Sequence, residues 1–251
     1  MIQLENVCFS LAGREILSQL SLTVPAGQTY VLLGPSGCGK STVLRLVMGL
    51  IRPNAGRILI DGLPLADTQN NPAGPTRGMV FQSSALFDFL TVYENIALGL
   101  RKKGNLTEAE IKERVRQELD RVGLGDDPDL LGKTPAELSG GMQKRVAIAR
   151  TLALDPKIIL YDEPTTGLDP IMAGLINDLI RRVHRRLKIT SILVTHDLNC
   201  ALRVGDEIGL LYQGKIRESA PARSLPEKAG PLLRQFLDGR LTGPITINGG
   251  W

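Results

Sequence analysis

Short apolar runs and longer helical patterns alternate along this chain, and their order predicts its architecture. Between residues 2 and 24 the apolar positions alternate or form short runs, with breaks at Ala12-Gly13 and at Pro25-Ala26-Gly27. Runs of this length between turn residues are typical of strands, so we expect strands and a hairpin here. The run from Arg57 to Ile60 ends at the turn signal Asp61-Gly62 and predicts a further strand.

A strand, a loop and a helix are predicted between Tyr30 and Pro53. The apolar run Tyr30 to Leu33 precedes a glycine-rich stretch, after which apolar residues recur at helical spacing, namely Val43, Leu44, Val47 and Leu50. We expect this helix to stop before Pro53, because the residue that precedes a proline avoids helical geometry. Residues 70 to 78 are rich in Asn, Pro and Gly and predict a surface loop before a short strand, Met79 to Gln82.

The middle of the chain has a different pattern. From about Leu86 to Leu154, long helical periodicities replace the short strands. The clearest helix begins at a capping box formed by Thr107 and Glu110, and one face carries Ile111, Val115, Leu119 and Val122. Core packing is the simplest interpretation of that stripe. We interpret the whole segment as a helical insertion.

Strands return after residue 157. The apolar run Ile158 to Tyr161 predicts a buried strand, and Ile189 to Val194 predicts another. Between them Asp169-Pro170 is typical of a helix start, and we expect one face of that helix to carry Ile171, Leu175, Leu179, Val183 and Leu187. Gln213-Gly214 predicts a closing hairpin. Alternating strands and helices are typical of parallel α/β folds.

The glycine-rich stretch matches the phosphate-binding pattern of Gly, any four residues, then Gly-Lys-Ser/Thr. Its residues are Gly34, Pro35, Ser36, Gly37, Cys38, Gly39, Lys40, Ser41 and Thr42. Glycines allow consecutive backbone N–H groups to surround an anion, and the helix that follows directs its positive end at it. Lys40 would add a mobile charge, and Ser41 would offer a hydroxyl oxygen to Mg²⁺. The strand–loop–helix context disfavours the alternative, an ordinary glycine turn.

Two acids, Asp162 and Glu163, follow the buried strand that ends at Tyr161. Beside a phosphate loop, Asp162 would hold Mg²⁺ through water. Glu163, one residue further and therefore on the other side of the strand, would orient and polarise the water that attacks the terminal phosphate. An Asp-Glu pair is more often a surface turn, but its position after a buried strand favours the functional interpretation.

A second anion-binding motif reads Leu138-Ser139-Gly140-Gly141-Met142 and opens a helix that contains Val146, Ala147 and Ile148. The N-terminus of a helix is suited to an anion. Because this motif lies about a hundred residues from the phosphate loop, we expect each nucleotide to be held between two copies of the protein.

Composition and charge exclude little. Of the 251 residues 43% are hydrophobic and 22% are charged, as in ordinary globular proteins, and the net charge of +4 is too small to indicate a nucleic acid or a membrane surface. No run approaches the roughly 18 apolar residues of a membrane span, and the start of the chain does not resemble a signal segment. Cys8, Cys38 and Cys200 lie far apart and predict reduced thiols.

The motifs together resemble those of ABC-type ATPases. The phosphate loop, Gln82, the signature Leu138 to Met142, the acids Asp162-Glu163 and His196 occur in the order and approximate spacing of that family, over residues 1 to 220. The resemblance implies an α/β fold: a P-loop NTPase (RecA-like) core with an antiparallel β-subdomain and an inserted α-helical subdomain. Residues 1–85 and 155–220 would form the core with the β-subdomain, 86–154 the helical subdomain and 221–251 a C-terminal extension, all within one ABC ATPase domain.

The resemblance also assigns roles to individual residues. It implies that Glu163, His196 and Gln82 are catalytic, and that Ser41, Gln82 and Asp162 hold Mg²⁺. The residues implied to bind ATP besides the phosphate loop are Ser139, Gly140, Gly141 and Asp169. Thr166 to Asp169 resembles the loop that crosses the dimer interface, and Gln82 the glutamine that links the nucleotide site to a transmembrane partner. A strand-end polar residue is the plain alternative for Gln82, and a structural histidine for His196 and, more strongly, for His184.

Three positions depart from the family pattern. Leu11 stands where an adenine-stacking aromatic is usual, and Phe9, two residues earlier, is a substitute or a core residue. Met142 replaces the more usual glutamine of the signature. Cys38 occupies a variable position of the phosphate loop, where alkylation would block the nucleotide. ATP is therefore better supported by the phosphate loop than by the base site.

The segment Phe81 to Asn95 resembles ATPases of Mla/Mce-type phospholipid transporters, as do Gln235 to Gly239 and Gly243-Pro244-Ile245. This resemblance implies a homodimer at the cytoplasmic face of a membrane, bound to permease subunits and supplied by a lipid-binding substrate protein, without nucleic acid. Another importer branch, such as one for polar amino acids, is one alternative. A soluble ABC ATPase acting on DNA or ribosomes is the other. We interpret the basic run Arg181 to Lys188 as a solvated face.

Overall fold

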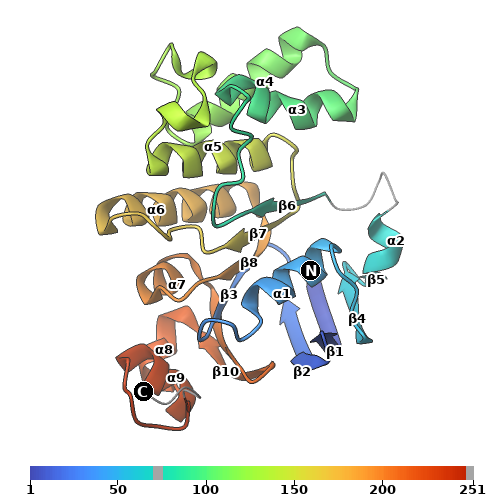
Figure 1. Ribbon diagram of the computed structural model, residues 1–251, viewed down its shortest axis with the longest axis vertical. Coiled ribbons are helices and arrows are strands. Elements are labelled where there is room, and N and C mark those ends of the chain that lie inside the picture. Colours follow the sequence, from blue (N-terminus) through green and yellow to red (C-terminus); the bar gives the residue numbers. More distant parts are fainter. Residues whose placement is uncertain (70–75, 247–251) are drawn as a thin grey trace. The chain divides into compact units, whose positions relative to one another are not determined.

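A computed structural model describes residues 1–69 and 76–246. Residues 70–75, in the expected surface loop, and 247–251, at the end of the expected extension, lie outside the described residues. The described chain forms two compact units (Figure 1). The first comprises residues 1–69 and 190–246, and the second comprises residues 76–189.

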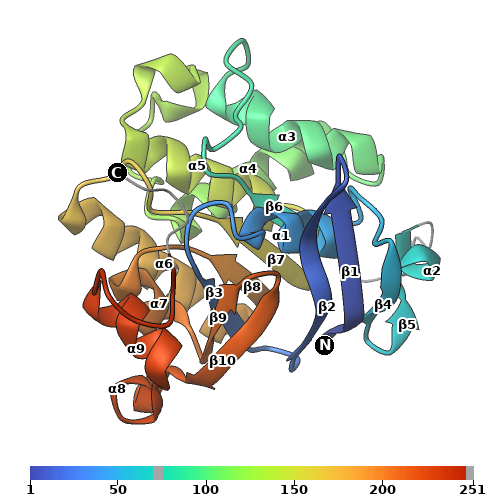
Figure 2. The same cartoon turned by 60° about the horizontal axis from the view of Figure 1, so that its bottom comes forward.

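The first unit begins with an antiparallel sheet. Its strands are β1 (Ile2–Leu11), β2 (Arg14–Val24), β4 (Ala55–Ile60) and β5 (Leu63–Pro64), in the order β2-β1-β4-β5, and the short helix α2 (Leu65–Gln69) follows. β1 and β2 form the predicted hairpin, visible as a long blue ribbon in Figure 2. Its turn, Ala12-Gly13, has positive φ at both residues, as does Asp61-Gly62 between β4 and β5. Both turn predictions are confirmed.

A parallel sheet forms the rest of this unit's core. β3 (Thr29–Leu33) pairs in parallel with β8 (Thr190–Val194) on one side and with β9 (Glu207–Tyr212) on the other, and β10 (Lys215–Pro221) pairs antiparallel with β9. The side chains of β3 are buried throughout, because neighbouring strands flank it on both edges. The helices of this unit are α1 (Lys40–Met48), α7 (Leu198–Val204), α8 (Leu225–Lys228) and α9 (Pro231–Asp238), with the 3₁₀ turn η3 (Ala222–Ser224).

One detail of the α1 prediction is wrong. The helix ends at Met48, and Gly49 closes it in the left-handed conformation. Leu50 therefore lies beyond the helix and is 60% exposed instead of sharing the buried face of Val43, Leu44 and Val47.

The C-terminal extension folds back onto α9 as far as residue 246. The buried amide of Gln235 accepts a hydrogen bond from the Ile245 N–H at 2.6 Å and donates one to the Ile245 carbonyl at 3.1 Å. The Thr246 N–H also donates to the Tyr212 hydroxyl at 3.0 Å. Two independent contacts thus attach the described part of the extension to its own unit.

The second unit combines two strands with four α-helices. β6 (Arg77–Val80) and β7 (Ile158–Asp162) pair in parallel. The helices are α3 (Val92–Lys103), α4 (Glu108–Arg121), α5 (Gly140–Leu152) and α6 (Pro170–Leu187), with 3₁₀ turns η1 (Leu130–Gly132) and η2 (Pro135–Glu137). α3, α4 and α5 pack together (green to yellow-green in Figure 1) and correspond to the predicted helical insertion. The capping box at Thr107 and the buried face of α4 are confirmed.

The predicted apolar face of α6 is partly wrong. Ile171 is 78% exposed and Leu175 45% exposed, whereas the side chains that pack inward are Ile176, Leu179, Ile180 and Val183. The buried set follows the helical spacing i, i+3, i+4, i+7. The basic residues Arg181, Arg182, Arg185, Arg186 and Lys188 are all exposed, in agreement with a solvated face.

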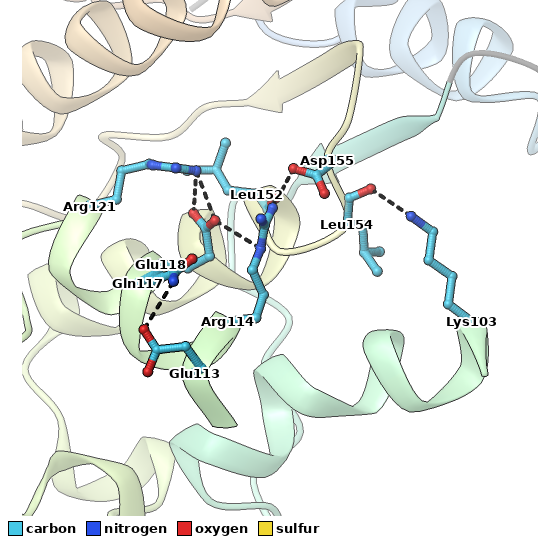
Figure 3. A network of polar contacts seen from close by, with 9 residues as sticks. All are labelled: Lys103, Glu113, Arg114, Gln117, Glu118, Arg121, Leu152, Leu154 and Asp155. Carbon is cyan, nitrogen blue, oxygen red and sulfur yellow. Dashed lines mark hydrogen bonds and ion pairs between the residues drawn. The ribbon is translucent and has the colours of Figure 1, made fainter. Parts of the chain in front are cut away.

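A polar network ties α4 to the end of α5 (Figure 3). The Glu118 carboxylate is fully buried between the guanidinium groups of Arg114 and Arg121, at 3.1 and 2.8 Å. Arg114 also bonds the Asp155 carboxylate and the Leu152 carbonyl, so one side chain holds both the last turn of α5 and the turn that leads to β7. The Lys103 ammonium donates to the Leu154 carbonyl at 3.2 Å. The path from α5 to β7 is therefore fixed from α3 and α4.

Candidate nucleotide-binding and hydrolysis site

The phosphate loop lies between β3 and α1, as predicted, and its glycines have physical reasons. Gly34 has φ +156°, and a Cβ there would lie 2.4 Å from the Leu211 carbonyl oxygen and 2.8 Å from the Cys38 sulfur. Gly39 has φ +105° and lies against the side chains of Ile16 and Leu17. The loop is thus pressed against its own unit with no room for side chains at these two positions.

Lys40 occupies the centre of this loop. The side chain is buried, and its ammonium donates to the carbonyl oxygens of Gly34 at 2.7 Å and Pro35 at 3.0 Å. Burial raises the pKa of the Cys38 thiol, while the Lys40 charge opposes that rise, so Cys38 is held as the neutral thiol. A cation held by a loop at a helix N-terminus fits the polyphosphate of a nucleotide.

His196 lies in the same unit, in the turn between β8 and α7. Its imidazole is exposed, while the neighbouring Thr195 is buried and accepts a hydrogen bond from the Asp197 N–H at 3.0 Å. Asp197 in turn caps α7 through the Asn199 N–H at 2.8 Å. The strand end thus presents His196 on a turn whose geometry is fixed from both sides.

The two acids lie in the second unit, where β7 ends at Asp162. Glu163 is already outside the strand, with a left-handed backbone of φ +49°. Its direction is therefore set by this turn and not by strand alternation, which the sequence argument assumed. Thr166 donates its hydroxyl to the Glu163 carboxylate at 3.2 Å. Non-glycine residues in this strained region are frequent at functional sites.

The signature motif opens α5. The Ser139 hydroxyl accepts a hydrogen bond from the Met142 N–H at 3.3 Å and caps the helix, while Ser139 and Gly140 are exposed. Gly141 is buried, because a Cβ there would lie 2.3 Å from the terminal methyl of Met172. Asp169 caps α6 by accepting from the Ile171 and Met172 N–H groups. The N-termini of α5 and α6 therefore lie close together, with exposed N–H groups at the start of α5.

Gln82 lies beyond the end of β6, in an exposed turn and not within the predicted strand. Its backbone carbonyl accepts a hydrogen bond from the Lys144 ammonium of α5. The sequence argument did not single out Lys144, which is only 5% exposed. Burial lowers the pKa of its ammonium, and the carboxylates of Asp162 and Glu163 oppose that shift. A lysine within the apolar part of a helix was the one available signal.

The site residues fall into two groups. The first unit contains the phosphate loop and His196, and the second contains Gln82, the two acids, the signature and Asp169. Ser41, Gln82 and Asp162 offer only oxygen ligands, which is the chemistry that Mg²⁺ prefers. The described residues contain no cluster of three or more His, Cys, Asp or Glu side chains suited to a metal. A metal that takes most of its ligands from phosphates and water fits this set.

The position expected to stack on the base is not aromatic. Leu11 ends β1 and is 64% exposed, and Phe9 is half-buried. Register irregularities on both sides of Phe9 interrupt the strand alternation that would place it on the same face as Leu11.

His184 fits the structural interpretation. Its Nε2 lies 3.0 Å from the Tyr161 hydroxyl in the interior of the second unit, and burial lowers its pKa to about 4.

Comparison with known proteins decides the family. A family model described as "ABC transporter" matches residues 17–166, which include the phosphate loop, the signature and both acids. The chain belongs to the ABC transporter ATPases. It is therefore the ATP-binding subunit of an ABC transporter, it binds ATP, and it hydrolyses ATP.

Related ABC ATPases match nearly the whole chain. The intermembrane phospholipid transport system ATP-binding protein MlaF of Haemophilus influenzae is 38% identical over 98% of this chain and 93% of its own length. MlaF of Escherichia coli is also 38% identical, over 98% and 91%. The probable ribonucleotide transport ATP-binding protein mkl of Mycobacterium tuberculosis is 40% identical over 98% of this chain and 69% of its own length.

Solved structures confirm the ABC ATPase fold. The dimeric ATP-binding cassette MJ0796, bound to ADP and Pi in a post-hydrolysis state, is 33% identical, with a TM-score of 0.78 over 89% of this chain and 99% of that chain. CbiO1 of Clostridium perfringens, part of the transporter complex cbiONQ, is 31% identical, with a TM-score of 0.79 over 90% and 91%. Within residues 1–69 and 76–246, no helix has the length and apolar character needed to cross a membrane.

Proposed function

We propose that this ABC ATPase drives the movement of phospholipid by a membrane permease. The observation that carries the proposal is the 38% identity to MlaF, which extends over 98% of this chain and 93% of that protein. A match of this extent includes segments outside the ATPase motifs. Among them are Phe81 to Asn95 and the C-terminal residues 235–245, whose resemblance to Mla/Mce-type ATPases supports the same cargo.

The binding step uses the phosphate loop of one copy and the signature of another. Lys40 exchanges its two carbonyl partners for phosphate oxygens, and the loop N–H groups and the α1 N-terminus hold the same anion. In a homodimer, Ser139 to Gly141 and Asp169 of the second copy cover this nucleotide with the exposed start of α5. The printed description of MJ0796 as dimeric supports this arrangement.

Hydrolysis uses the acids of the second unit. Glu163 accepts a proton from a water molecule, whose oxygen attacks the terminal phosphorus while the bond to the bridging oxygen of ADP breaks. ADP and phosphate are released as products. Gln82 and His196 orient the water and the terminal phosphate. Ser41, Gln82 and Asp162 would hold Mg²⁺, which when bound neutralises charge on the phosphates.

The partners follow from this role. Permease subunits would receive the ATPase at the cytoplasmic face of a membrane, and a lipid-binding substrate protein would supply the cargo. A second candidate cargo is a ribonucleotide, which the printed name of mkl favours. A polar amino-acid importer and an ATPase that acts on nucleic acid remain the weaker alternatives, since neither has a relative of this extent in support.

Purification from gently solubilised membranes of the native host, with mass spectrometry of co-eluting proteins and lipids, tests the proposal. We expect a multi-span permease, a lipid-binding protein and bound phospholipid. Recovery with a small-solute receptor would reassign the cargo, and recovery only with nucleic acid or ribosomes would overturn the membrane role. A preparation of the Glu163→Gln variant serves as a control, because it traps the assembly before turnover.

A further inference from the structure

The turn after β6 is held by α5 at two separate places. The Lys144 ammonium donates to the Gln82 carbonyl, and the Arg150 guanidinium donates to the carbonyls of Ala85 at 2.7 Å and Ser84 at 3.0 Å. Three backbone acceptors within residues 82–85 are therefore bound by two cations of the helix that begins at the signature motif. We call residues 82–85 the Gln82 turn.

The Gln82 turn has a backbone that does not hold itself. Ser84 and Ala85 have left-handed φ values of +63° and +47°, which cost non-glycine residues of order 1 kcal/mol each and persist only when surrounding contacts impose them. The described hydrogen bonds that impose them come chiefly from α5. Without Lys144 and Arg150, we expect the turn to relax and the side chain of Gln82 to lose its defined direction.

Both cations are committed to this task. Lys144 is 5% exposed, and burial lowers the pKa of both Lys144 and Arg150. A buried cation is tolerated only where hydrogen bonds replace its water, so these side chains have few other places to go. The two attachment points lie six residues apart, which is about 9 Å along the helix axis. Two points so separated restrain both sliding and tilting of the turn against α5.

We infer that Lys144 and Arg150 are positioning residues that make the Gln82 turn and the signature helix move as one body. The inference rests on the proposed roles of Gln82 and of Ser139 to Gly141. Any shift of α5 as its N-terminus closes over a nucleotide is then transmitted to the backbone of Gln82. A misplacement of about 1 Å at a reacting group is enough to lower a rate about 100-fold.

The test compares ATP turnover by Lys144 variants of the purified transporter complex. Lys144→Met removes the donor but keeps a chain of similar volume, so we expect kcat to fall about tenfold or more while KM for ATP stays within about twofold. Lys144→Arg keeps a cationic donor and should return kcat to within about threefold. Arg145→Met, the neighbouring half-exposed residue that bonds the Gly123 carbonyl, is the matched control and should behave as the parent.

Two further measurements separate positioning from folding. Lys144→Met should melt at or above the parent temperature, because replacing a buried charge with an apolar side chain seldom destabilises a protein when the charge has no buried ionic partner. In a double-mutant cycle, Lys144→Met should add nothing to the loss caused by Gln82→Ala, since Lys144 acts through Gln82. A melting point well below the parent, or losses that multiply in the cycle, would overturn the inference.

The two levels of the argument fail in different ways. Full turnover by Gln82→Ala removes the proposed role of Gln82 and overturns the inference with it. Normal kcat in Lys144→Met beside an impaired Gln82→Ala overturns only the inference and leaves the proposed function intact.

Discussion

Gly34→Ala tests whether close packing and backbone strain shape the phosphate loop. A Cβ at this position would lie 2.4 Å from the Leu211 carbonyl oxygen, whereas ordinary contacts begin near 3.4 Å, so the overlap is about 1 Å with backbone of β9. Forcing such an overlap costs about 1–3 kcal/mol, and holding alanine at φ +156° costs about 1–3 kcal/mol more. We expect about 4 kcal/mol of lost stability in total.

Gly37→Ala provides the matched control. Its φ of +77° is also unfavourable for alanine, but nothing lies within 4 Å of the added Cβ, so only about 1 kcal/mol should be lost. Thermal unfolding of the nucleotide-free protein measures both variants. At about 2–4 °C per kcal/mol for a chain of this size, Gly34→Ala should melt roughly 10 °C lower and Gly37→Ala only a few degrees lower. Equal melting temperatures would refute the steric argument.

Three further predictions address the chemistry and the core. Glu163→Gln should retain ATP binding, lose turnover about 100-fold or more and accumulate a closed dimer on size-exclusion chromatography; normal turnover would reject Glu163 as the base. Lys40→Ala should weaken binding of a fluorescent ATP analogue at least about tenfold, since a charge-assisted contact is lost, and unchanged affinity would contradict the assigned role. Because burial lowers the pKa of His184 to about 4 from 6.5 when unfolded, about 3 kcal/mol of stability is present above pH 6.5 and is lost as pH falls toward 4, a slope that His184→Gln should flatten in denaturant titrations at several pH values.

Local patterns predicted most of the fold because each carried its own physical signal. The α4 helix has a capping box at Thr107 and apolar residues at 111, 115, 119 and 122, which return to one face of the helix. The expected α6 face failed for a geometric reason. Each step of four residues advances about 40° around a helix, so Ile171 and Leu187 at the ends of a purely i+4 series lie about 160° apart.

The site was predicted where short motifs carry the chemistry and missed where distant segments meet. The phosphate loop and the signature lie in the expected strand–loop–helix and helix-start contexts. Lys144 and the Gln82 carbonyl are 62 residues apart, and a bond from a side chain to a backbone oxygen leaves no periodicity in the sequence. The left-handed turn at Glu163 was likewise hidden, since glutamate has no preference for that conformation.

ATP-dependent phospholipid movement by the purified complex tests the central proposal most directly. The complex would be placed in vesicles that contain a fluorescent phospholipid, with Mg²⁺ and ATP supplied on the side of the ATPase. We predict that the labelled lipid moves only with ATP, and that the same complex carrying Glu163→Gln moves none. ATP turnover that ignores phospholipid but rises with an added ribonucleotide would contradict the lipid assignment.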